Sequence, residues 1–199
     1  MKKMLFTPAV ERLGSALAAL LVLGIAAPGH VAHAAPAHRA GSEAVLTNPP
    51  QGSVVRITSA VSGRCLEADM NTINQLGTKV QLWGCLPNAY NQMWRVVLAN
   101  GGVELVNLQS NRCLDADINS DVNGTRVQLW DCNGTYQQGW TFSGAGNRGG
   151  ISNNAFFNRH PNGPCMLDAD LNSLPWDGTW VQLWSPNGQP QQEWIWTNA

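Results

Sequence analysis

The sequence has few charged residues and no strong excess of either sign. Charged side chains make up 13% of its 199 residues, and the formal net charge is −1. Proteins that bind nucleic acids or anionic membranes through charge usually carry clustered basic residues. We therefore predict that neither nucleic acid nor an anionic membrane surface is a partner.

Apolar runs long enough to span a membrane are also lacking. The main one, at 13–27, is too short for a comfortable span. It follows Lys2 and Lys3 and precedes the small-x-small sequence Ala32-His33-Ala34. This order is typical of a secretory signal peptide. We predict a signal peptide over 1–34, cleavage to leave 165 residues with 9 basic and 12 acidic side chains, and a secreted, extracellular protein without membrane insertion.

Residues that bind metals are sparse or unsuitably spaced. Three of the four His precede residue 39, which argues against a zinc site. The stretches 115–119 and 168–172 are similar to the start of a calcium loop, but Ser120 and Ser173 stand where that loop requires glycine. We expect no metal and no cofactor.

Sustained helical periodicity is absent after residue 34. Short β-prone runs, at 54–57, 103–106 and 156–157, alternate instead with Gly, Asn and Asp. Residues 35–52 contain Pro36, Pro49 and Pro50 and show no periodicity, which predicts a linker or tail. The sequence therefore predicts one all-β domain over 53–199.

A threefold repeat is the dominant pattern in that domain. Val-Gln-Leu-Trp occurs at 80–83, 127–130 and 181–184, each time after a Gly-Thr pair. The Gln of each copy lies 10 or 11 residues before the Gln of a Gln-x-Trp triplet, at 92–94, 138–140 and 192–194. Repeats of roughly 50 residues, about 53–99, 100–147 and 148–199, predict a β-trefoil closed by pseudo-threefold symmetry. A three-bladed propeller fits the period, but propellers usually need at least four blades.

Four of the five cysteines are spaced alike in two repeats. Cys65 and Cys85 are 20 positions apart, and Cys113 and Cys132 are 19 apart. Both pairs bracket the same motif, so we predict the disulfides Cys65–Cys85 and Cys113–Cys132.

Repeat three departs from this spacing. Met166 and Pro186 stand in the places of the two cysteines, which leaves Cys165 unpaired. Cys165 is either a buried thiol or one half of an intermolecular bridge. We expect the first, and hence a monomer.

Side chains alternate along each Val-Gln-Leu-Trp strand. In the second copy, Val127 and Leu129 face the core, while Gln128 and Trp130 face outward. A fold that needs only stability would more often place Thr, Lys or Glu on an outer face. The repeated amide and indole therefore indicate a ligand. The tryptophans of the Gln-x-Trp triplets, by contrast, are expected in the core.

Acidic residues are expected to face these outward side chains. If each disulfide joined directly opposed residues, Asp115 would lie opposite Trp130, and Asp117 opposite Gln128. The same assumption pairs Glu67 with Trp83 and Asp69 with Gln81. Repeat three lacks the disulfide, but alignment of Asp168 with Trp184, as in the other repeats, pairs Asp170 with Gln182. Carboxylates and amides bind hydroxyls, and an indole packs against the apolar face of a sugar ring. The pattern thus predicts a sugar site in each repeat.

These motifs resemble the ricin B-chain type lectins, including the carbohydrate-binding modules of secreted bacterial glycosidases, over about 53–199. The resemblance implies a sugar held by an acid, by the Gln and Trp of the Gln-Leu-Trp strand, and by the two residues that open the Gln-x-Trp motif. It implies as sugar-binding residues Glu67, Gln81, Trp83, Asn91 and Gln92 in repeat one, Asp115, Gln128, Trp130, Gln137 and Gln138 in repeat two, and Asp168, Gln182, Trp184, Gln191 and Gln192 in repeat three.

Departures from the family pattern rank the repeats. Glu67 replaces the usual Asp in repeat one, Gln137 and Gln191 stand where Asn is usual, and repeat three lacks its disulfide. We rank repeat two first, then three, then one. Trp on the binding strand resembles galactose-binding members more than xylan-binding ones, which often have Tyr there.

The sequence therefore predicts a secreted lectin with up to three shallow sites for galactose-like or polysaccharide ligands. We predict no catalysis, because the pair Asp115 and Asp117 recurs in every repeat on a surface without a lid. The alternative is a protein-binding trefoil such as a protease inhibitor, which would need no threefold chemistry. Trp176 and Trp180 either extend the sugar platform of repeat three or cover its unbridged hairpin.

Overall fold

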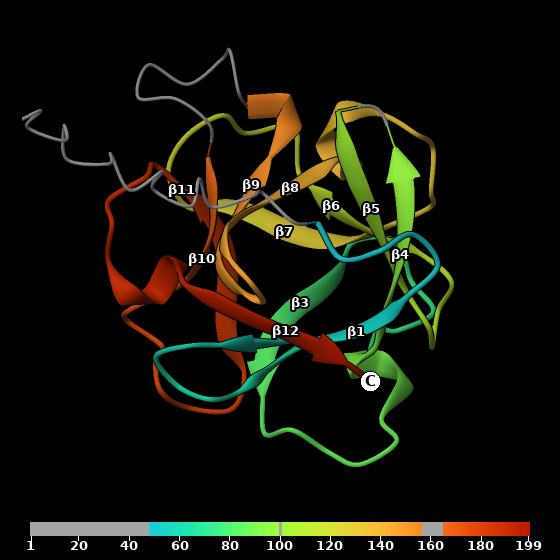
Figure 1. Ribbon diagram of the computed structural model, residues 1–199, viewed down its shortest axis with the longest axis horizontal. Coiled ribbons are helices and arrows are strands. Elements are labelled where there is room, and N and C mark those ends of the chain that lie inside the picture. Colours follow the sequence, from blue (N-terminus) through green and yellow to red (C-terminus); the bar gives the residue numbers. More distant parts are fainter. Residues whose placement is uncertain (1–47, 100, 157–164) are drawn as a thin grey trace, which may run out of the picture. The chain divides into compact units, whose positions relative to one another are not determined.

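The computed structural model describes residues 48–99, 101–156 and 165–199 (Figure 1). These residues contain twelve β-strands and four short 3₁₀ helices, and no α-helix. None of these helices has the length and apolar character needed to cross a bilayer. The predicted signal peptide, 1–34, lies outside the described residues, as does the predicted linker up to residue 47.

Each repeat contributes four strands in the same order. Repeat one has β1 (Val54–Ser59), β2 (Cys65–Ala68), β3 (Thr78–Trp83) and β4 (Trp94–Ala99). Repeat two has β5 (Gly102–Asn107), β6 (Cys113–Ala116), β7 (Thr125–Trp130) and β8 (Trp140–Ala145). Repeat three has β9 (Arg148–Asn153), β10 (Met166–Ala169), β11 (Thr179–Trp184) and β12 (Trp194–Asn198). The 3₁₀ helices are η1 (Tyr90–Gln92), η2 (Tyr136–Gln138), η3 (Asn154–Phe156) and η4 (Pro190–Gln192).

Six strands form a closed antiparallel ring in the order β1, β4, β5, β8, β9 and β12. The ring closes where β12 pairs with β1, with Val55 opposite Asn198, and Figure 1 shows these red and cyan strands side by side. The other six strands form the hairpins β2–β3, β6–β7 and β10–β11. Strands β3, β7 and β11 also pair with one another. This arrangement is the β-trefoil that the three repeats predict.

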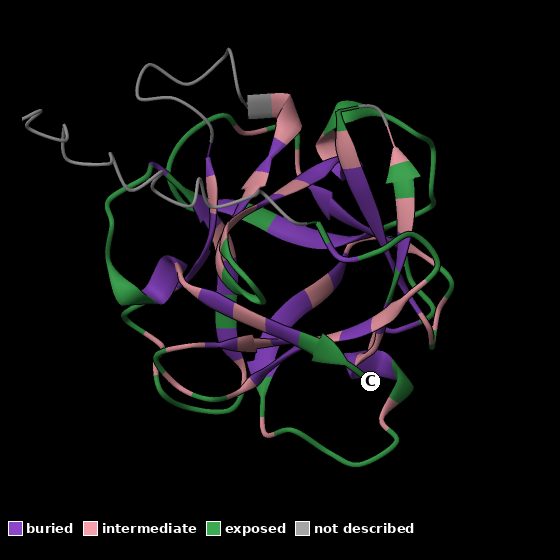
Figure 2. Cartoon of the chain, viewed as in Figure 1, coloured by how far each residue is buried: buried purple, intermediate pink, exposed green. Residues whose placement is uncertain are grey.

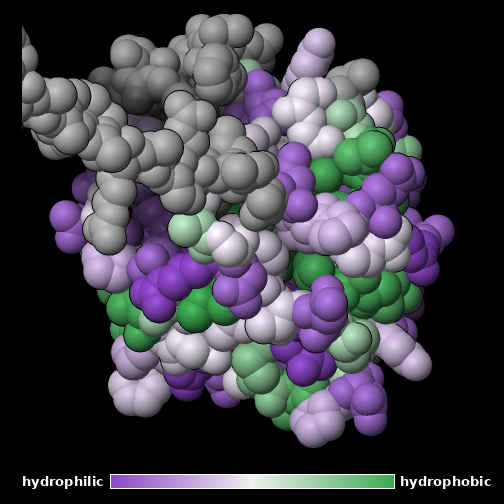
Figure 3. Space-filling view, in the orientation of Figure 1, coloured by the Kyte–Doolittle hydropathy of each residue, from purple (hydrophilic) through white to green (hydrophobic). Residues whose placement is uncertain are grey.

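The Gln-x-Trp tryptophans lie in the core, as expected. Trp94, Trp140 and Trp194 are fully buried. Each indole N–H donates to a backbone oxygen at 3.0 to 3.1 Å, those of Leu66, Leu114 and Leu167. A buried indole thus keeps its hydrogen bond while it fills the interior. Figure 2 shows buried residues along the strands and exposed ones in the connecting loops. In Figure 3, hydrophilic and hydrophobic residues are interspersed on the coloured part of the face.

The disulfides Cys65–Cys85 and Cys113–Cys132 are both present. Cys165 is free and buried, which agrees with the buried-thiol interpretation. Burial also raises the pKa of its thiol, so the thiolate is disfavoured.

The predicted register of the hairpins is wrong by two residues. Cys113, and not Asp115, lies opposite Trp130, and Asp115 lies opposite Gln128. The other hairpins show the same shift, with pairs Cys65–Trp83, Glu67–Gln81, Met166–Trp184 and Asp168–Gln182. The cause is that β7 ends at Trp130, so that Cys132 lies in the following loop and the disulfide does not join opposed residues. Because the shift is even, every side chain keeps its predicted face.

One of the predicted β-prone runs, in repeat three, is not a strand. The run 156–157 is not a strand, because Phe156 ends η3, while residue 157 lies outside the described residues. The first strand of repeat three is instead β9, which contains Gly149 and Gly150. A Cβ on Gly149 would lie 1.8 Å from the Ser143 carbonyl oxygen, and one on Gly150 would lie 2.3 Å from Met166 Cε. Backbone packing therefore requires glycine at 149, whereas a Cβ at 150 would displace only the flexible end of Met166. Both glycines lower β-propensity.

The described part of the predicted linker, 48–52, packs against the trefoil. The Phe142 N–H donates to Asn48 Oδ1 at 2.9 Å, and the Gly52 N–H donates to the Val96 oxygen at 2.8 Å. Pro49 is buried. These contacts attach the chain to the strands before β1 begins.

Candidate functional sites

Each hairpin holds a buried carboxylate between two glutamine amides. In repeat two, Asp115 Oδ1 accepts from Gln128 Nε2 at 3.1 Å, and Oδ2 accepts from Gln138 Nε2 at 3.0 Å. Asp115 is 4% exposed. The equivalent bonds join Glu67 to Gln81 and Gln92, and Asp168 to Gln182 and Gln192. The acid and the two glutamines predicted in each repeat are thus in direct contact.

Gln138 connects the acid to the loop after the binding strand. Besides its bond to Asp115, Nε2 donates to the Asp131 carbonyl at 3.0 Å, and Oε1 accepts from the Asn133 N–H at 2.9 Å. The side chain is fully buried. Gln92 and Gln192 make the same set of bonds. These three glutamines therefore fix the orientation of the carboxylates.

The indole that ends each binding strand is half-exposed. Trp83, Trp130 and Trp184 have exposed fractions of 37%, 38% and 37%. Their near identity follows from one backbone position, the last residue of β3, β7 or β11, used three times. Each repeat therefore presents an aromatic surface to solvent beside its buried acid.

Burial raises the pKa of Glu67, Asp115 and Asp168 above the ordinary value, because the charged form loses water. The glutamine amides oppose this effect, since they donate to the ionised carboxylate. An ionised carboxylate offers about four acceptor positions. At Asp115 two are used by Gln128 and Gln138, so the rest are available to hydroxyl donors.

A second acid follows each hairpin acid by two positions and forms a turn. Asp117 Oδ1 accepts from the backbone N–H and the Nδ2 of Asn119, at 3.0 and 2.8 Å. Asp69 with Asn71 and Asp170 with Asn172 form the same turn. The stretches similar to a calcium loop are thus hydrogen-bonded turns. In the part of the chain that the structure describes, no three His, Cys, Asp or Glu side chains are grouped to hold a metal ion.

Surface hollows lie beside the acids of repeats two and three. The hollow of repeat two has a volume of about 470 Å³ and is lined by Asp115, Gln128, Trp130 and Gln137, among others. That of repeat three has about 290 Å³ and is lined by Asp168, Gln182, Trp184 and Gln191, among others. In both repeats, the predicted residues therefore surround a space that a ligand can enter.

The residue before the second glutamine differs among repeats. Asn91 is buried, and its amide donates to the Ala68 carbonyl at 3.1 Å. Gln191 is also buried and bonds to Asp168. Gln137 is only half-buried, and its side-chain amide has no partner among the described residues. The predicted binding role is therefore best matched by Gln137.

A glycine of the preceding repeat lies near the binding-strand glutamine of each site, and none of these glycines was among the predicted site residues. A Cβ on Gly77 of repeat one would lie 3.5 Å from Gln128 Oε1 of repeat two, and Gly77 has a φ of +78°. Gly124 and Gly178 lie in the same way against Gln182 and Gln81. Arg126 of repeat two also donates to the Gly77 carbonyl. The Gly-Thr pair before each strand was the available signal, because a positive φ favours glycine.

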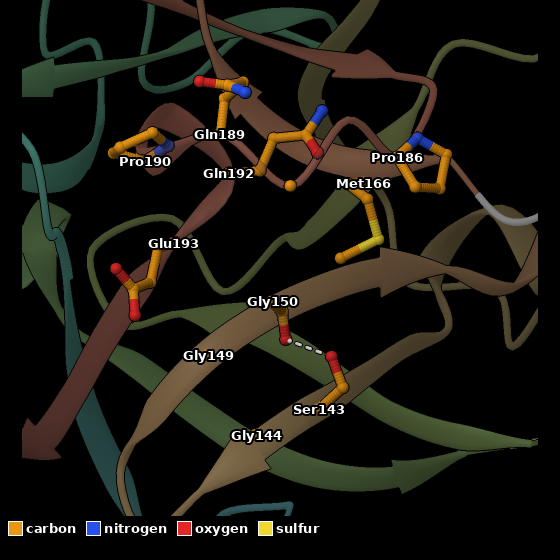
Figure 4. A pocket seen from close by; sticks show the side chains of 11 residues that line it. Ser143, Gly144, Gly149, Gly150, Met166, Pro186, Gln189, Pro190, Gln192 and Glu193 are labelled. Carbon is orange, nitrogen blue, oxygen red and sulfur yellow. Dashed lines mark hydrogen bonds between the residues drawn. The ribbon is translucent and has the colours of Figure 1, made fainter.

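A hollow of about 490 Å³ between repeats two and three has a different lining (Figure 4). It includes Met166 and Pro186, which stand in place of the cysteines, and the figure shows the Met166 side chain pointing toward Gly150. Glu193 also lines it, but its carboxylate accepts two bonds of 2.7 Å from Arg148. This hollow lacks the indole and the amide-held acid of the other two.

The two tryptophans specific to repeat three lie at its surface. Trp176 is 71% exposed and Trp180 is 47% exposed. Lys79 Nζ of repeat one lies 4.3 Å from the centre of a Trp180 ring. Trp180 therefore contacts a neighbouring repeat, through a cation–π interaction that neither sequence interpretation included.

The chain belongs to the ricin-type β-trefoil lectin domain family, whose sequence profile matches residues 53–194. Among curated protein sequences, none matches the chain significantly.

Similar solved structures support the fold. ThreeFoil, a designed threefold symmetric protein, has 23% identity and a TM-score of 0.64, over 73% of this chain and 99% of that one. An exo-β-1,3-galactanase from Clostridium thermocellum has 24% identity and a TM-score of 0.65, over 76% of this chain and 31% of the galactanase. A Macrolepiota procera ricin B-like lectin, solved with lactose, has 18% identity and a TM-score of 0.61, over 77% and 100%.

Proposed function

We propose that the protein is a secreted lectin that binds sugar rings in shallow sites, foremost in repeat two, and catalyses no reaction. The observation that carries this proposal is the amide-held carboxylate beside a half-exposed indole, built in the same way in three hairpins. Stability alone does not require such a polar cluster, because burial of a charge is costly even when it is hydrogen-bonded.

The chemistry of the cluster fits a sugar. The acceptor positions of Asp115 that Gln128 and Gln138 leave open suit the hydroxyls of one ring edge. The exposed face of Trp130 suits the C–H side of the same ring. Binding by these groups needs neither a metal nor a cofactor.

The solved relatives bear on the kind of sugar. The Macrolepiota procera lectin was solved with lactose, and the C-half of an earthworm R-type lectin with GalNAc. Both ligands are of the galactose type, as the Trp on the binding strand predicts. We propose galactose-like terminal sugars as the first ligands to test, followed by plant and microbial polysaccharides.

A shallow site should bind one monosaccharide at about millimolar concentration, or about −4 kcal/mol. Stronger attachment would come from several sites of one monomer that engage the same glycan-bearing surface. The two disulfides indicate an oxidising environment, which supports secretion together with the predicted signal peptide at 1–34.

The proposal predicts different outcomes for two tryptophan substitutions. Trp130→Ala removes an exposed indole, so we expect a folded protein whose repeat-two affinity is about tenfold weaker. Trp94→Ala removes a buried indole and should destabilise the fold by about 3–5 kcal/mol. A glycan array, followed by calorimetric titration of the best ligand, measures binding, and thermal unfolding measures stability.

The titrations should be made in a Trp83→Ala, Trp184→Ala background, which leaves repeat two as the site. Unchanged affinity of folded Trp130→Ala protein would remove repeat two from the proposal. Protease inhibition that excess sugar does not relieve, without glycan binding, would favour a protein-binding trefoil.

A further inference from the structure

Repeat two has a second hollow next to its proposed sugar site. This hollow has a volume of about 750 Å³, and its lining includes Thr135, Tyr136 and Gln137. It shares Ile118 and Gln137 with the hollow of about 470 Å³ beside Asp115. The two hollows therefore adjoin at the side chains of Ile118 and Gln137.

The second hollow has polar and apolar lining residues, and two of its large apolar side chains are exposed. Tyr136, the first residue of η2, is 62% exposed, and Ile118 is 51% exposed. The Tyr136 hydroxyl has no hydrogen-bond partner within residues 48–99, 101–156 and 165–199. Folding thus gains little from this aromatic ring. A flat aromatic side chain beside polar groups is suited to the face and edge of a sugar ring.

Gln137 lies at the boundary of the two hollows. Of the three residues at this repeat position, Asn91 and Gln191 bond to their own repeats, whereas the side-chain amide of Gln137 has no partner among the described residues. An amide both donates and accepts, so at this place it can bond to hydroxyls of two successive rings. Neither equivalent residue is free to do so.

We propose that repeat two binds an oligosaccharide of at least two rings. The first ring lies against Trp130 and Asp115, the second lies on Tyr136 beside Ile118, and the Gln137 amide bonds between them. This inference rests on the proposed lectin function and adds the ligand length and the residues that select it.

The other repeats supply a comparison. Repeat one keeps a tyrosine at the equivalent position, Tyr90, which is 57% exposed, but its neighbour Asn91 is bonded to Ala68. Repeat three has Pro190 at that position. Selection for a longer ligand is therefore expected at repeat two.

The test compares a monosaccharide with a longer ligand that contains it. The full chain carries Trp83→Ala and Trp184→Ala so that repeat two is the site, and calorimetry measures its affinity for galactose and lactose, and for xylose and xylotriose. We expect the longer member of the binding pair to bind about tenfold tighter. Tyr136→Ala should bring this ratio close to one, and Gln137→Ala should lower it. Tyr90→Ala, the matched control in repeat one, should leave it unchanged.

Two outcomes overturn the inference and leave the lectin function intact. Either both members of the binding pair bind equally to the parent protein, or Tyr136→Ala leaves their ratio unchanged. If neither pair binds, and a glycan array shows no other ligand, the lectin proposal fails and this inference fails with it. Thermal unfolding of each variant checks that the fold is retained.

Discussion

Asp115 combines two properties that oppose each other. It is buried, which disfavours its ionised form, yet each oxygen accepts an amide hydrogen bond that favours ionisation. The net result is a raised pKa, as for Glu67 and Asp168. A ligand hydroxyl that donates to Asp115 would add to the amides and favour the ionised form further.

This balance predicts a pH dependence of opposite sign for binding and folding. Below the raised pKa, Asp115 is protonated and loses acceptor capacity, so glycan affinity should fall as the pH falls through that value. Because the folded pKa lies above the ordinary value of 3.8, the folded state holds more protons between the two values. The Asp115 contribution to stability should therefore decrease as the pH rises through this window.

Titration and thermal unfolding at pH 7 and at about pH 4 measure both trends. Comparison with Asp115→Asn isolates this residue from the other acids. An unchanged pH profile of repeat-two binding in Asp115→Asn protein would contradict an acceptor role for Asp115.

Residue patterns predicted which side chains meet, but not every contact between them. Alternation along the strand correctly separates buried Val127 and Leu129 from half-exposed Trp130. The exact partner of Asp115 depended on where the disulfide attaches, and spacing alone does not reveal that Cys132 lies beyond the strand. The hydrogen bond from the Gln138 side chain to the Asp131 carbonyl depends on the geometry of a turn. The periodicity of the sequence does not predict that geometry.

Among the elements, the hairpins of repeats one and two carry a disulfide that repeat three lacks. The Cys113–Cys132 bond closes a loop with a sequence separation of 19. A disulfide limits the unfolded chain, and for a loop of this size the effect is about 3 kcal/mol. We expect Cys113→Ser with Cys132→Ser to lower the free energy of unfolding by about that amount.

Urea denaturation, with Cys165→Ser as a control that leaves both bonds intact, measures this change. A loss below about 1 kcal/mol would show that the hairpin pairing holds the loop without the bond.

The predicted β-prone runs 54–57 and 103–106 are strands, whereas β9 was missed because packing overrides propensity there. β1 and β5 contain the valine runs that mark them. β9 contains Gly149, where the neighbouring backbone leaves no room for a Cβ, and Gly150, where a Cβ would meet the flexible end of Met166. That requirement arises from contacts between distant parts of the chain, so the local sequence does not indicate it.

At the scale of the molecule, three similar sites favour multivalent binding. Trp83→Ala with Trp184→Ala should lower the apparent affinity for an immobilised polysaccharide by about 100-fold, since linked sites raise avidity by that order. The affinity of repeat two for a soluble sugar should stay the same. Surface plasmon resonance on a polysaccharide surface, compared with solution titration, measures the two quantities. If the apparent affinity for the polysaccharide surface stays as constant as the affinity for the soluble sugar, the sites do not act together.

The threefold repeat was sufficient to predict the trefoil, because three equal units of strands can close a ring without exposed edges. It was not sufficient to predict contacts between the units. Those depend on which residues of one repeat reach the next across β3, β7 and β11.

The glycine that each repeat places near the glutamine of the next repeat makes the three repeats mutually dependent. Gly77 of repeat one lies near Gln128 of repeat two, Gly124 of repeat two near Gln182 of repeat three, and Gly178 of repeat three near Gln81 of repeat one. The relation is therefore cyclic and includes all three repeats. Deletion of a single unit would damage not only its own cluster but also that of its successor. Exchange of the side chains at positions 79, 126 and 180, by contrast, leaves these three glycines in place.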